Sequence, residues 1–333
     1  MTAPPSQRAV RGSGPAVVAL GGGHGLSATL SALRLMTDRI TAVVTVADDG
    51  GSSGRLREEL GVLPPGDLRM ALAALCDDSD WGRTWRDVLQ HRFASDGALD
   101  RHAVGNLLIV ALWELLGDTV EGLDWVGRLL GARGRVLPMA AVPLRIEADV
   151  VHADGSPEHV SGQVQVATTR GRIEHLRLEP ADPPACPEAV EAVLSADWVV
   201  LGPGSWYTSV MPHLLVPGLR DALHRTPART ILTLNLSPES GETAGMRAEQ
   251  YLDALLDHAP ELRVDAVVAD PGAVDDVGML GEACERTGAR LLLRQVGRGD
   301  GTPLHDPLRL AAAFRDVVEG FLGDVGTRAD RVR

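Results

Sequence analysis

The chain has 333 residues, of which 44% are hydrophobic and 23% charged, a composition that predicts a globular protein and excludes a fully disordered or fibrous one. The formal net charge of −13 makes non-specific binding to nucleic acid or to an anionic membrane unfavourable. All 32 basic residues are arginines, which excludes Schiff-base chemistry on lysine and the lysine of a P-loop. We therefore expect no nucleic-acid partner.

The cysteines and the apolar runs indicate the compartment. Cys76, Cys186 and Cys284 lie far apart and form no C-x-x-C pair, so a disulfide framework or a zinc site is not expected. Residues 1–14 are rich in Pro, Ser and Gly and predict a disordered tail rather than a signal peptide. The longest apolar run, residues 107–113, is far shorter than the roughly 18 residues needed to span a bilayer. We expect a cytoplasmic protein without membrane insertion.

Short β-rich runs alternate with helical patterns from residue 16 onward. The expected strands are 16–20, 41–46, 198–201, 230–235, 264–268 and 290–293. The expected helices are 26–33, 68–76, 106–116, 188–194, 246–256 and 308–321. Strands that are apolar on both faces suit a parallel sheet covered on both sides. The alternation predicts a doubly wound, mainly parallel, Rossmann-like α/β sheet in one domain over residues 15–330.

The stretch from about 144 to 178 has a different pattern. Apolar residues recur at every second position, as in Ile146, Ala148 and Val150, and again at Val164 and Val166. Turn signals at positions 154–155 and 170–171 separate these runs. We expect a small antiparallel β insertion here.

A glycine-rich turn follows the first expected strand and opens a helix. Backbone N–H groups and the helix N-terminus at such a turn attract an anion. The turn fits neither the dinucleotide fingerprint nor the P-loop, and a tight packing turn is the alternative. The candidate phosphate-binding residues are Gly21, Gly22, Gly23, His24, Gly25 and Leu26.

A second polar cluster follows the strand expected at 41–46. One carboxylate here would suit a ribose hydroxyl, whereas Asp48 and Asp49 together could hold Mg²⁺. Arg55 could clamp a phosphate, and an ordinary Asx turn is the alternative. The candidate ligand residues are Asp48, Asp49, Gly50, Ser52, Ser53, Gly54 and Arg55.

Two further clusters open helices. Asp67 reads as the N-cap of the helix that follows it. Arg69 in the first turn is unfavourable for the helix dipole, which points to an anionic partner. His102 and Asn106 lead into an apolar helix, where Asn106 could cap the helix or read a base or hydroxyl.

A second glycine-rich turn follows the strand at 198–201, and Asn235 ends the next strand. Ser205 lies in no G-x-S-x-G elbow and no ordered Ser-His-Asp set is recognisable, so hydrolase chemistry is not expected. Ligands of open α/β sheets bind outside the carboxyl ends of the strands, where most of these clusters lie. The candidates here are Gly202, Gly204, Ser205, Thr208 and Asn235.

Six blocks carry a family resemblance: GGGHGLS (21–27), DDGGSSGRLR (48–57), LPPGDLRMAL (63–72), HAVGNLL (102–108), LGPGSWYTSVMPHLL (201–215) and GET (241–243). With them the chain resembles the gluconeogenesis factor family (YvcK-like) within the CofD-like superfamily. The resemblance implies a Rossmann-like fold, binding of UDP-sugars, and a cytoplasmic regulatory role that links carbon metabolism to envelope synthesis and cell shape. Members of the wider superfamily transfer a phospholactyl group onto a deazaflavin precursor with Mg²⁺.

The chain departs from the family pattern at three places. His24 stands where many members have Thr, and Glu239-Ser240 where Gln-Pro is usual. Residues 304–307 lack the Arg and the phosphorylatable Thr that some members carry.

Three interpretations stay open. In the first, a UDP-sugar or another nucleotide is bound by the amides of 21–25 and 202–205 with Arg55, while Asp48, Asp67 and Asn235 read hydroxyls or the base. In the second, a Mg²⁺-dependent 2-phospho-L-lactate transferase-like enzyme uses Asp48 and Asp49 for the metal and Arg55 and Arg69 for developing charge. An NAD(P) oxidoreductase is disfavoured by the broken fingerprint, and a homo-oligomer stays open.

Overall fold

The computed structural model describes residues 14–237 and 241–322. Apart from Gly14, the tail expected over residues 1–14 lies outside the described residues, as does Glu239-Ser240. Within the described ranges, no helix combines the length and apolar character that crossing a membrane requires.

A parallel sheet of seven strands forms the centre of the molecule, in the order β10-β9-β8-β7-β1-β2-β3. From β1 the order runs outward through β2 to β3, and from β7 it runs the other way through β8 and β9 to β10. This reversal is the doubly wound pattern, so the predicted fold class is confirmed. The strands are β1 (Val17–Gly21), β2 (Ile40–Val44), β3 (Arg135–Pro138), β7 (Trp198–Leu201), β8 (Arg229–Thr233), β9 (Ala266–Ala269) and β10 (Arg290–Leu293).

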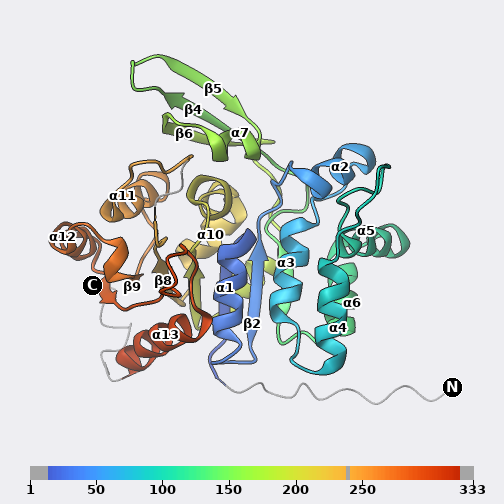
Figure 1. The fold of residues 1–333 in the computed structure, drawn as a ribbon. Coiled ribbons are helices and arrows are strands. Elements are labelled where there is room, and N and C mark those ends of the chain that lie inside the picture. Colours follow the sequence, from blue (N-terminus) through green and yellow to red (C-terminus); the bar gives the residue numbers. More distant parts are fainter. Residues whose placement is uncertain (1–13, 238–240, 323–333) are drawn as a thin grey trace.

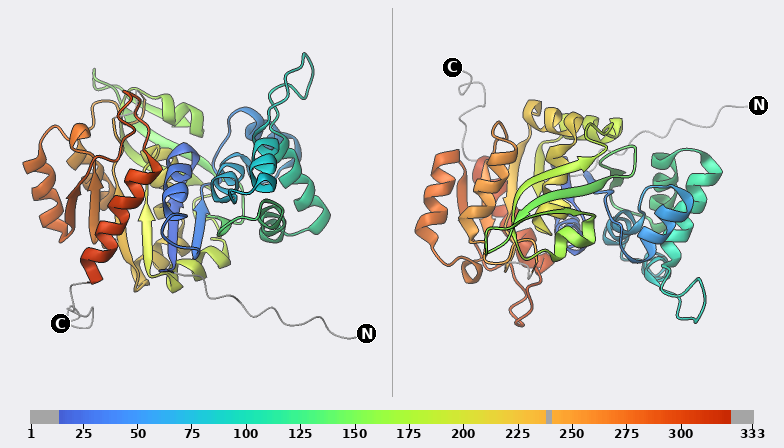
Figure 2. Two further views of the ribbon diagram at one scale, coloured as in Figure 1. Left: turned by 60° about the horizontal axis from the view of Figure 1, so that its bottom comes forward. Right: turned by 90° about the horizontal axis from the view of Figure 1, so that it is seen from above.

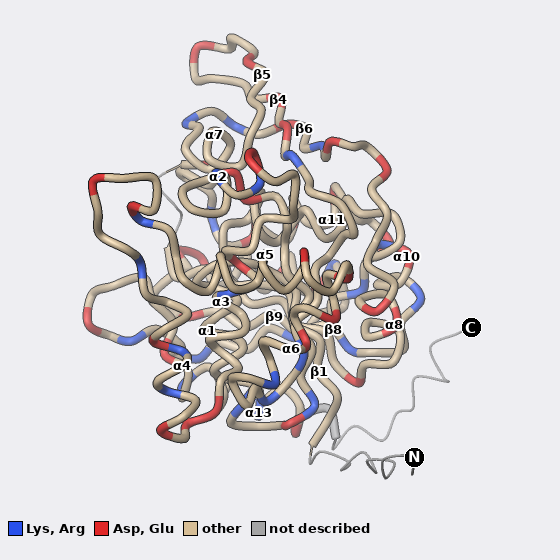
Figure 3. The backbone as a smooth tube through the Cα atoms, turned by 90° about the vertical axis from the view of Figure 1, so that its right-hand side faces the viewer, with Lys and Arg blue, Asp and Glu red and all other residues tan. Residues whose placement is uncertain are grey.

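Helices cover both faces of the sheet, which explains why β1 and β7 are buried along their whole length. One face carries α1 (Gly23–Leu33), α3 (Gly66–Leu75) and α13 (Pro307–Leu322), and the other carries α8 (Pro187–Ser195) and α10 (Pro217–Arg225), as Figure 3 shows edge-on. The other helices are α2 (Gly51–Leu60), α4 (Asp80–Gln90), α5 (Val104–Leu116), α6 (Thr119–Leu130), α9 (Pro212–Leu215), α11 (Ala248–His258) and α12 (Val277–Thr287), with short helical turns at Trp206–Val210 and Pro271–Ala273.

The predicted antiparallel insertion is confirmed as a second sheet of β4 (Arg145–Val151), β5 (Pro157–Ser161) and β6 (Arg172–Glu179). It lies across the ends of the central strands, at the top of Figure 1 and toward the viewer in the right panel of Figure 2. Val164 and Val166 were expected in a strand, which is wrong, because they lie in helix α7 (Gln163–Thr168). Gly162, with φ of 111°, ends the extended backbone before this helix.

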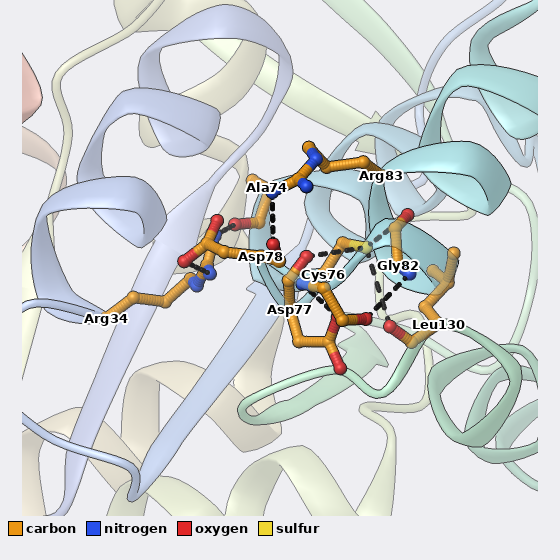
Figure 4. A network of polar contacts seen from close by, with 9 residues as sticks. Arg34, Ala74, Cys76, Asp77, Asp78, Gly82, Arg83 and Leu130 are labelled. Atoms are coloured by element: carbon orange, nitrogen blue, oxygen red, sulfur yellow. Dashed lines mark hydrogen bonds and ion pairs between the residues drawn. The ribbon is translucent and has the colours of Figure 1, made fainter.

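A network of polar contacts forms where α3 ends and α4 begins (Figure 4). The thiol of Cys76 donates to the carbonyl of Gly82 at 2.9 Å and to that of Leu130 at 3.4 Å. Arg34 of α1 binds the carboxylate of Asp78 at 2.9 Å. Burial raises the pKa of the Cys76 thiol, so this cysteine is a structural group that connects the end of α3 to α4 and α6 rather than a nucleophile.

Candidate functional site

The two glycine-rich turns meet where the strand order reverses, between β1 and β7. A Cβ built on Gly25 would lie 2.1 Å from the carbonyl oxygen of Pro203, so only glycine permits this approach. The hydroxyl of Thr29 donates to the carbonyl of Gly202 at 3.2 Å and fastens α1 to the second turn. The structure therefore brings together the turns at 21–25 and 202–204, at the position where open α/β sheets bind ligands.

Asn235 shapes the second turn from the end of β8. Its Oδ1 accepts a hydrogen bond from the Gly204 N–H at 2.9 Å, and its Nδ2 donates to the Gly204 carbonyl at 2.9 Å. Gly202 and Gly204 have φ values of 67° and 146°, which glycine adopts without strain, and the Asn235 amide holds the flexible turn in this conformation. Both polar atoms of Asn235 are thus bound to backbone, and its reading of a ligand stays a prediction.

Replacing Asn235 by alanine is expected to lower the free energy of unfolding by about 2 kcal/mol, because the two hydrogen bonds between its side chain and Gly204 are lost. Urea unfolding measures this change. Ser237→Ala removes an exposed hydroxyl nearby and is the matched control, expected to stay within about 0.5 kcal/mol of the wild type. An Asn235→Ala chain as stable as this control would contradict the bracing role.

A cavity of about 380 Å³ opens beside the two turns. Four of its lining residues, His24, Gly25, Gly204 and Asn235, are among the candidates named from the sequence, whereas no candidate lies in the segment between β10 and α13 that also lines the cavity. No strand end or glycine fingerprint marked that segment. The lining residues are His24, Gly25, Ser27, Ala28, Ser31, Pro203, Gly204, Asn235, Leu236, Ser237, Arg298, Pro303, Leu304, His305 and Pro307.

Two partly buried carboxyl groups lie next to the first turn. Asp67 accepts a hydrogen bond from the Gly23 N–H, and burial, followed by the charge of Asp48, raises its pKa to about 7. Burial also raises the pKa of Asp48, which accepts the Gly50 N–H at 2.9 Å. The prediction that Asp67 caps its own helix is wrong: α3 begins at Gly66, and Asp67 reaches across to α1 instead.

Asp49 and Arg55 are directed away from this pair. The two carboxylate oxygens of Asp49 accept the N–H groups of Gln163 at 2.9 Å and Val164 at 3.1 Å, at the start of α7. Arg55 donates to the carbonyls of Ala98 at 3.2 Å and Asp100 at 2.6 Å, in the loop before α5. The magnesium pair Asp48–Asp49 and the phosphate contact of Arg55 stay predictions. Among residues 14–237 and 241–322, no group of three or more His, Cys, Asp or Glu side chains could hold a metal ion.

A buried hydrogen-bond network joins the starts of α2, α3 and α5. Arg69 Nε donates to Asn106 Oδ1 at 2.9 Å, and Asn106 Nδ2 donates to Ser52 Oγ at 3.0 Å. Ser52 Oγ also accepts the Ala103 N–H at 3.3 Å and lies 3.1 Å from His102 Nδ1. Because Oγ already accepts twice, its proton goes to His102 Nδ1. Ser52, His102 and Asn106 therefore hold three helix starts in place.

Arg69 keeps one unused donor inside this network. The residue is 3% exposed, and its Nη1 has no hydrogen-bond partner within the described part of the chain. Burial, with the charge of Arg92, lowers its pKa to about 10, so the guanidinium remains charged at neutral pH. A Cβ on Gly105 would lie 2.8 Å from Arg69 Cδ, so this glycine makes room for the arginine. An unused cationic donor agrees with the anionic partner expected for Arg69.

The remaining candidates lie in the same region. Gly54 packs on the backbone of Asp49, where a Cβ would lie 2.1 Å from the carbonyl oxygen. The carbonyl of Ser205 accepts the Ser209 N–H at 2.8 Å in the turn after β7. Ser53 hydrogen-bonds to Asp48, Thr208 is buried, and Leu26 packs in the core.

Comparison with known proteins places the chain in a family. The family model described as 2-phospho-L-lactate transferase CofD matches residues 17–287. A Mycobacterium tuberculosis protein with the printed name "Putative gluconeogenesis factor" is 55% identical over 314 residues, which cover 92% of this chain and 91% of that protein. The gluconeogenesis factor of Bacillus subtilis is 37% identical over 265 residues, which cover 80% of this chain and 81% of that protein.

A solved structure agrees with the sequence relatives. The crystal structure of a UPF0052 family member from Bacillus halodurans matches with a TM-score of 0.81 and 32% identity, over 91% of this chain and 99% of that chain. The resemblance inferred from the six sequence blocks is confirmed by these matches. The chain belongs to the CofD family.

Proposed function

We propose that the chain binds a nucleotide-sugar, of the UDP-sugar type, in the cavity beside the two glycine-rich turns. The observation that carries this proposal is the contact of Gly25 with Pro203, which sets the start of α1 and the second turn around one cavity. The N-terminus of α1 supplies N–H groups and partial positive charge for a diphosphate. Arg298 lines the same cavity and adds a cation.

The proposed role is regulatory. Relatives with the printed name gluconeogenesis factor match most of the chain, which supports a role in carbon metabolism. In this proposal the protein acts in the cytoplasm and links carbon metabolism to envelope synthesis and cell shape.

A second candidate is a Mg²⁺-dependent transferase of the 2-phospho-L-lactate type. The observation in its favour is the pair of partly buried carboxyl groups of Asp48 and Asp67: burial raises the pKa of both, and the charge of Asp48 raises that of Asp67 further. Such oxygens fit a divalent cation, which would supply charge neutralisation for phosphoryl chemistry. Asp49 fits less well, because both of its carboxylate oxygens already accept backbone N–H groups.

Calorimetric titration with UDP-N-acetylglucosamine, with and without EDTA, separates the two candidates. We expect micromolar or tighter binding that EDTA leaves nearly unchanged. A ligand at 100 times its Kd should also add about 2.7 kcal/mol of apparent stability in a thermal-shift assay. No heat with any UDP-sugar, together with clear binding of a deazaflavin precursor, would favour the transferase. A large loss of affinity in EDTA would contradict a metal-independent sensor.

A further inference from the structure

The cavity contains a buried histidine that the sequence analysis did not single out. His305 lies between β10 and α13, where it forms an isolated bridge with Gly297. The residue is 8% exposed, and it lines the cavity together with His24 and Asn235. It therefore brings a segment that is distant in the sequence to the cavity that the start of α1 also lines.

One ring nitrogen of His305 is bound and the other is not. The ring hydrogen-bonds to the carbonyl of Leu234, whereas Nε2 is buried and has no partner in the part of the chain that the structure describes. A carbonyl oxygen only accepts, so Nδ1 carries the proton in this bond. Nε2 is then a bare acceptor in the neutral ring.

The surroundings keep the ring neutral. Burial lowers the pKa of His305 to about 4, against a smaller opposing effect of the Asp270 charge. The Asp270 carboxylate itself accepts the N–H groups of Gly272 at 2.9 Å, Val296 at 2.7 Å and Gly297 at 2.9 Å. The ionised Asp270 carboxylate is itself only an acceptor, so it cannot satisfy Nε2, and a buried acceptor without a partner is unfavourable.

We propose that Nε2 of His305 accepts a hydrogen bond from a neutral N–H or O–H donor of the bound ligand and selects nucleotide-sugars that carry one. The inference rests on the proposed function. A bare acceptor repels phosphate oxygens, so the diphosphate lies at the α1 end of the cavity. The donor-bearing group, either the base N–H or a sugar hydroxyl, lies at the His305 end.

Two substitutions separate the ligand contact from the structural one. In His305→Asn, the side-chain amide can take the place of Nδ1 and donate to Leu234, but nothing replaces Nε2. In His305→Gln, the longer side chain brings an amide oxygen to the place of Nε2. His175→Asn, the same substitution at an exposed position of β6 that does not line the cavity, is the control. We expect His305→Asn to weaken UDP-N-acetylglucosamine binding roughly 5- to 100-fold, and His305→Gln to recover part of it.

Thermal unfolding without ligand verifies that each variant is folded. Ligand analogues then identify which group of the ligand donates the hydrogen bond to His305 Nε2. If the base N–H is the donor, the wild type loses affinity for UDP methylated at uracil N3 by a similar factor. If a sugar hydroxyl is the donor, His305→Asn binds UDP as the wild type does and loses affinity only for the UDP-sugar. The comparison of UDP with its N3-methylated analogue uses only the wild type, so its result holds even if a variant misfolds.

The outcomes that overturn the inference are distinct from those that overturn the proposed function. Folded His305→Asn that binds the UDP-sugar as tightly as the wild type overturns the inference alone. A wild type that binds no UDP-sugar overturns the proposed function, and the inference with it.

Discussion

Replacing Gly25 by alanine is expected to lower the free energy of unfolding by about 3 kcal/mol or more and to abolish ligand binding. The added Cβ would lie 2.1 Å from the Pro203 carbonyl oxygen and 2.7 Å from the Gly204 Cα. Both are backbone atoms, so no side-chain rotation relieves the overlap. The helix and the second turn must separate, which opens the cavity between them.

Gly281 supplies the matched control, because it also lies inside a helix but a Cβ there would meet nothing within 4 Å. Gly281→Ala is expected to stabilise the chain by up to about 1 kcal/mol, as alanine is the better helix former. Urea unfolding of both variants measures the difference. A Gly25→Ala chain as stable as the wild type would show that α1 and the second turn do not touch as described.

Asp67 is expected to make stability fall as the pH rises from about 4 to 7. Its folded pKa of about 7 is above the ordinary value near 4, so the folded chain holds this proton more tightly than the unfolded chain. The stabilisation is complete below about pH 4 and is lost as the pH passes through 7. Three pKa units correspond to a loss on the order of 4 kcal/mol.

Asp67→Asn removes this titration and keeps an oxygen that can accept the Gly23 N–H. Other carboxyl groups, such as that of Asp149, have lowered pKa values and act in the opposite direction. The measured quantity is therefore the difference in free energy of unfolding between wild type and variant at several pH values from 4 to 8. Parallel curves for the two proteins would mean that Asp67 titrates normally.

The buried strands and the glycine-rich turns were predictable from the sequence, because local composition determines them. Strands that are apolar on both faces need a cover on both sides, and glycine turns at their ends mark the carboxyl edge. The order reversal between β1 and β7 then places the turns at 21–25 and 202–204 side by side.

Elements that depend on distant partners could not be predicted. Helix α7 begins where Asp49, from a remote part of the chain, accepts the N–H groups of Gln163 and Val164. Helix α2 starts in the glycine-rich stretch after Asp49, where the sequence predicts no helix, and β3 is only four residues long. Short or unfavourable sequences of this kind take their structure from tertiary contacts rather than from propensity.

In the candidate site, too, local sequence identifies the residues but not the distant groups that they contact. The sequence located the strand-end residues but not their partners, such as Gly204 for Asn235 or the carbonyls of Ala98 and Asp100 for Arg55. His305 was missed because its importance comes from a bond to Leu234 and from its place in the cavity wall, neither of which leaves a local pattern.

The most direct test of the central claim is a crystal structure of the chain with bound UDP-N-acetylglucosamine. We predict density in the cavity between α1 and residues 203–204, with the diphosphate within hydrogen-bond distance of the backbone N–H groups at the start of α1. The most informative alternative position is the cavity of about 350 Å³ lined by residues such as Arg220 and Glu261. Ligand bound there, with the cavity at α1 empty, would contradict the account.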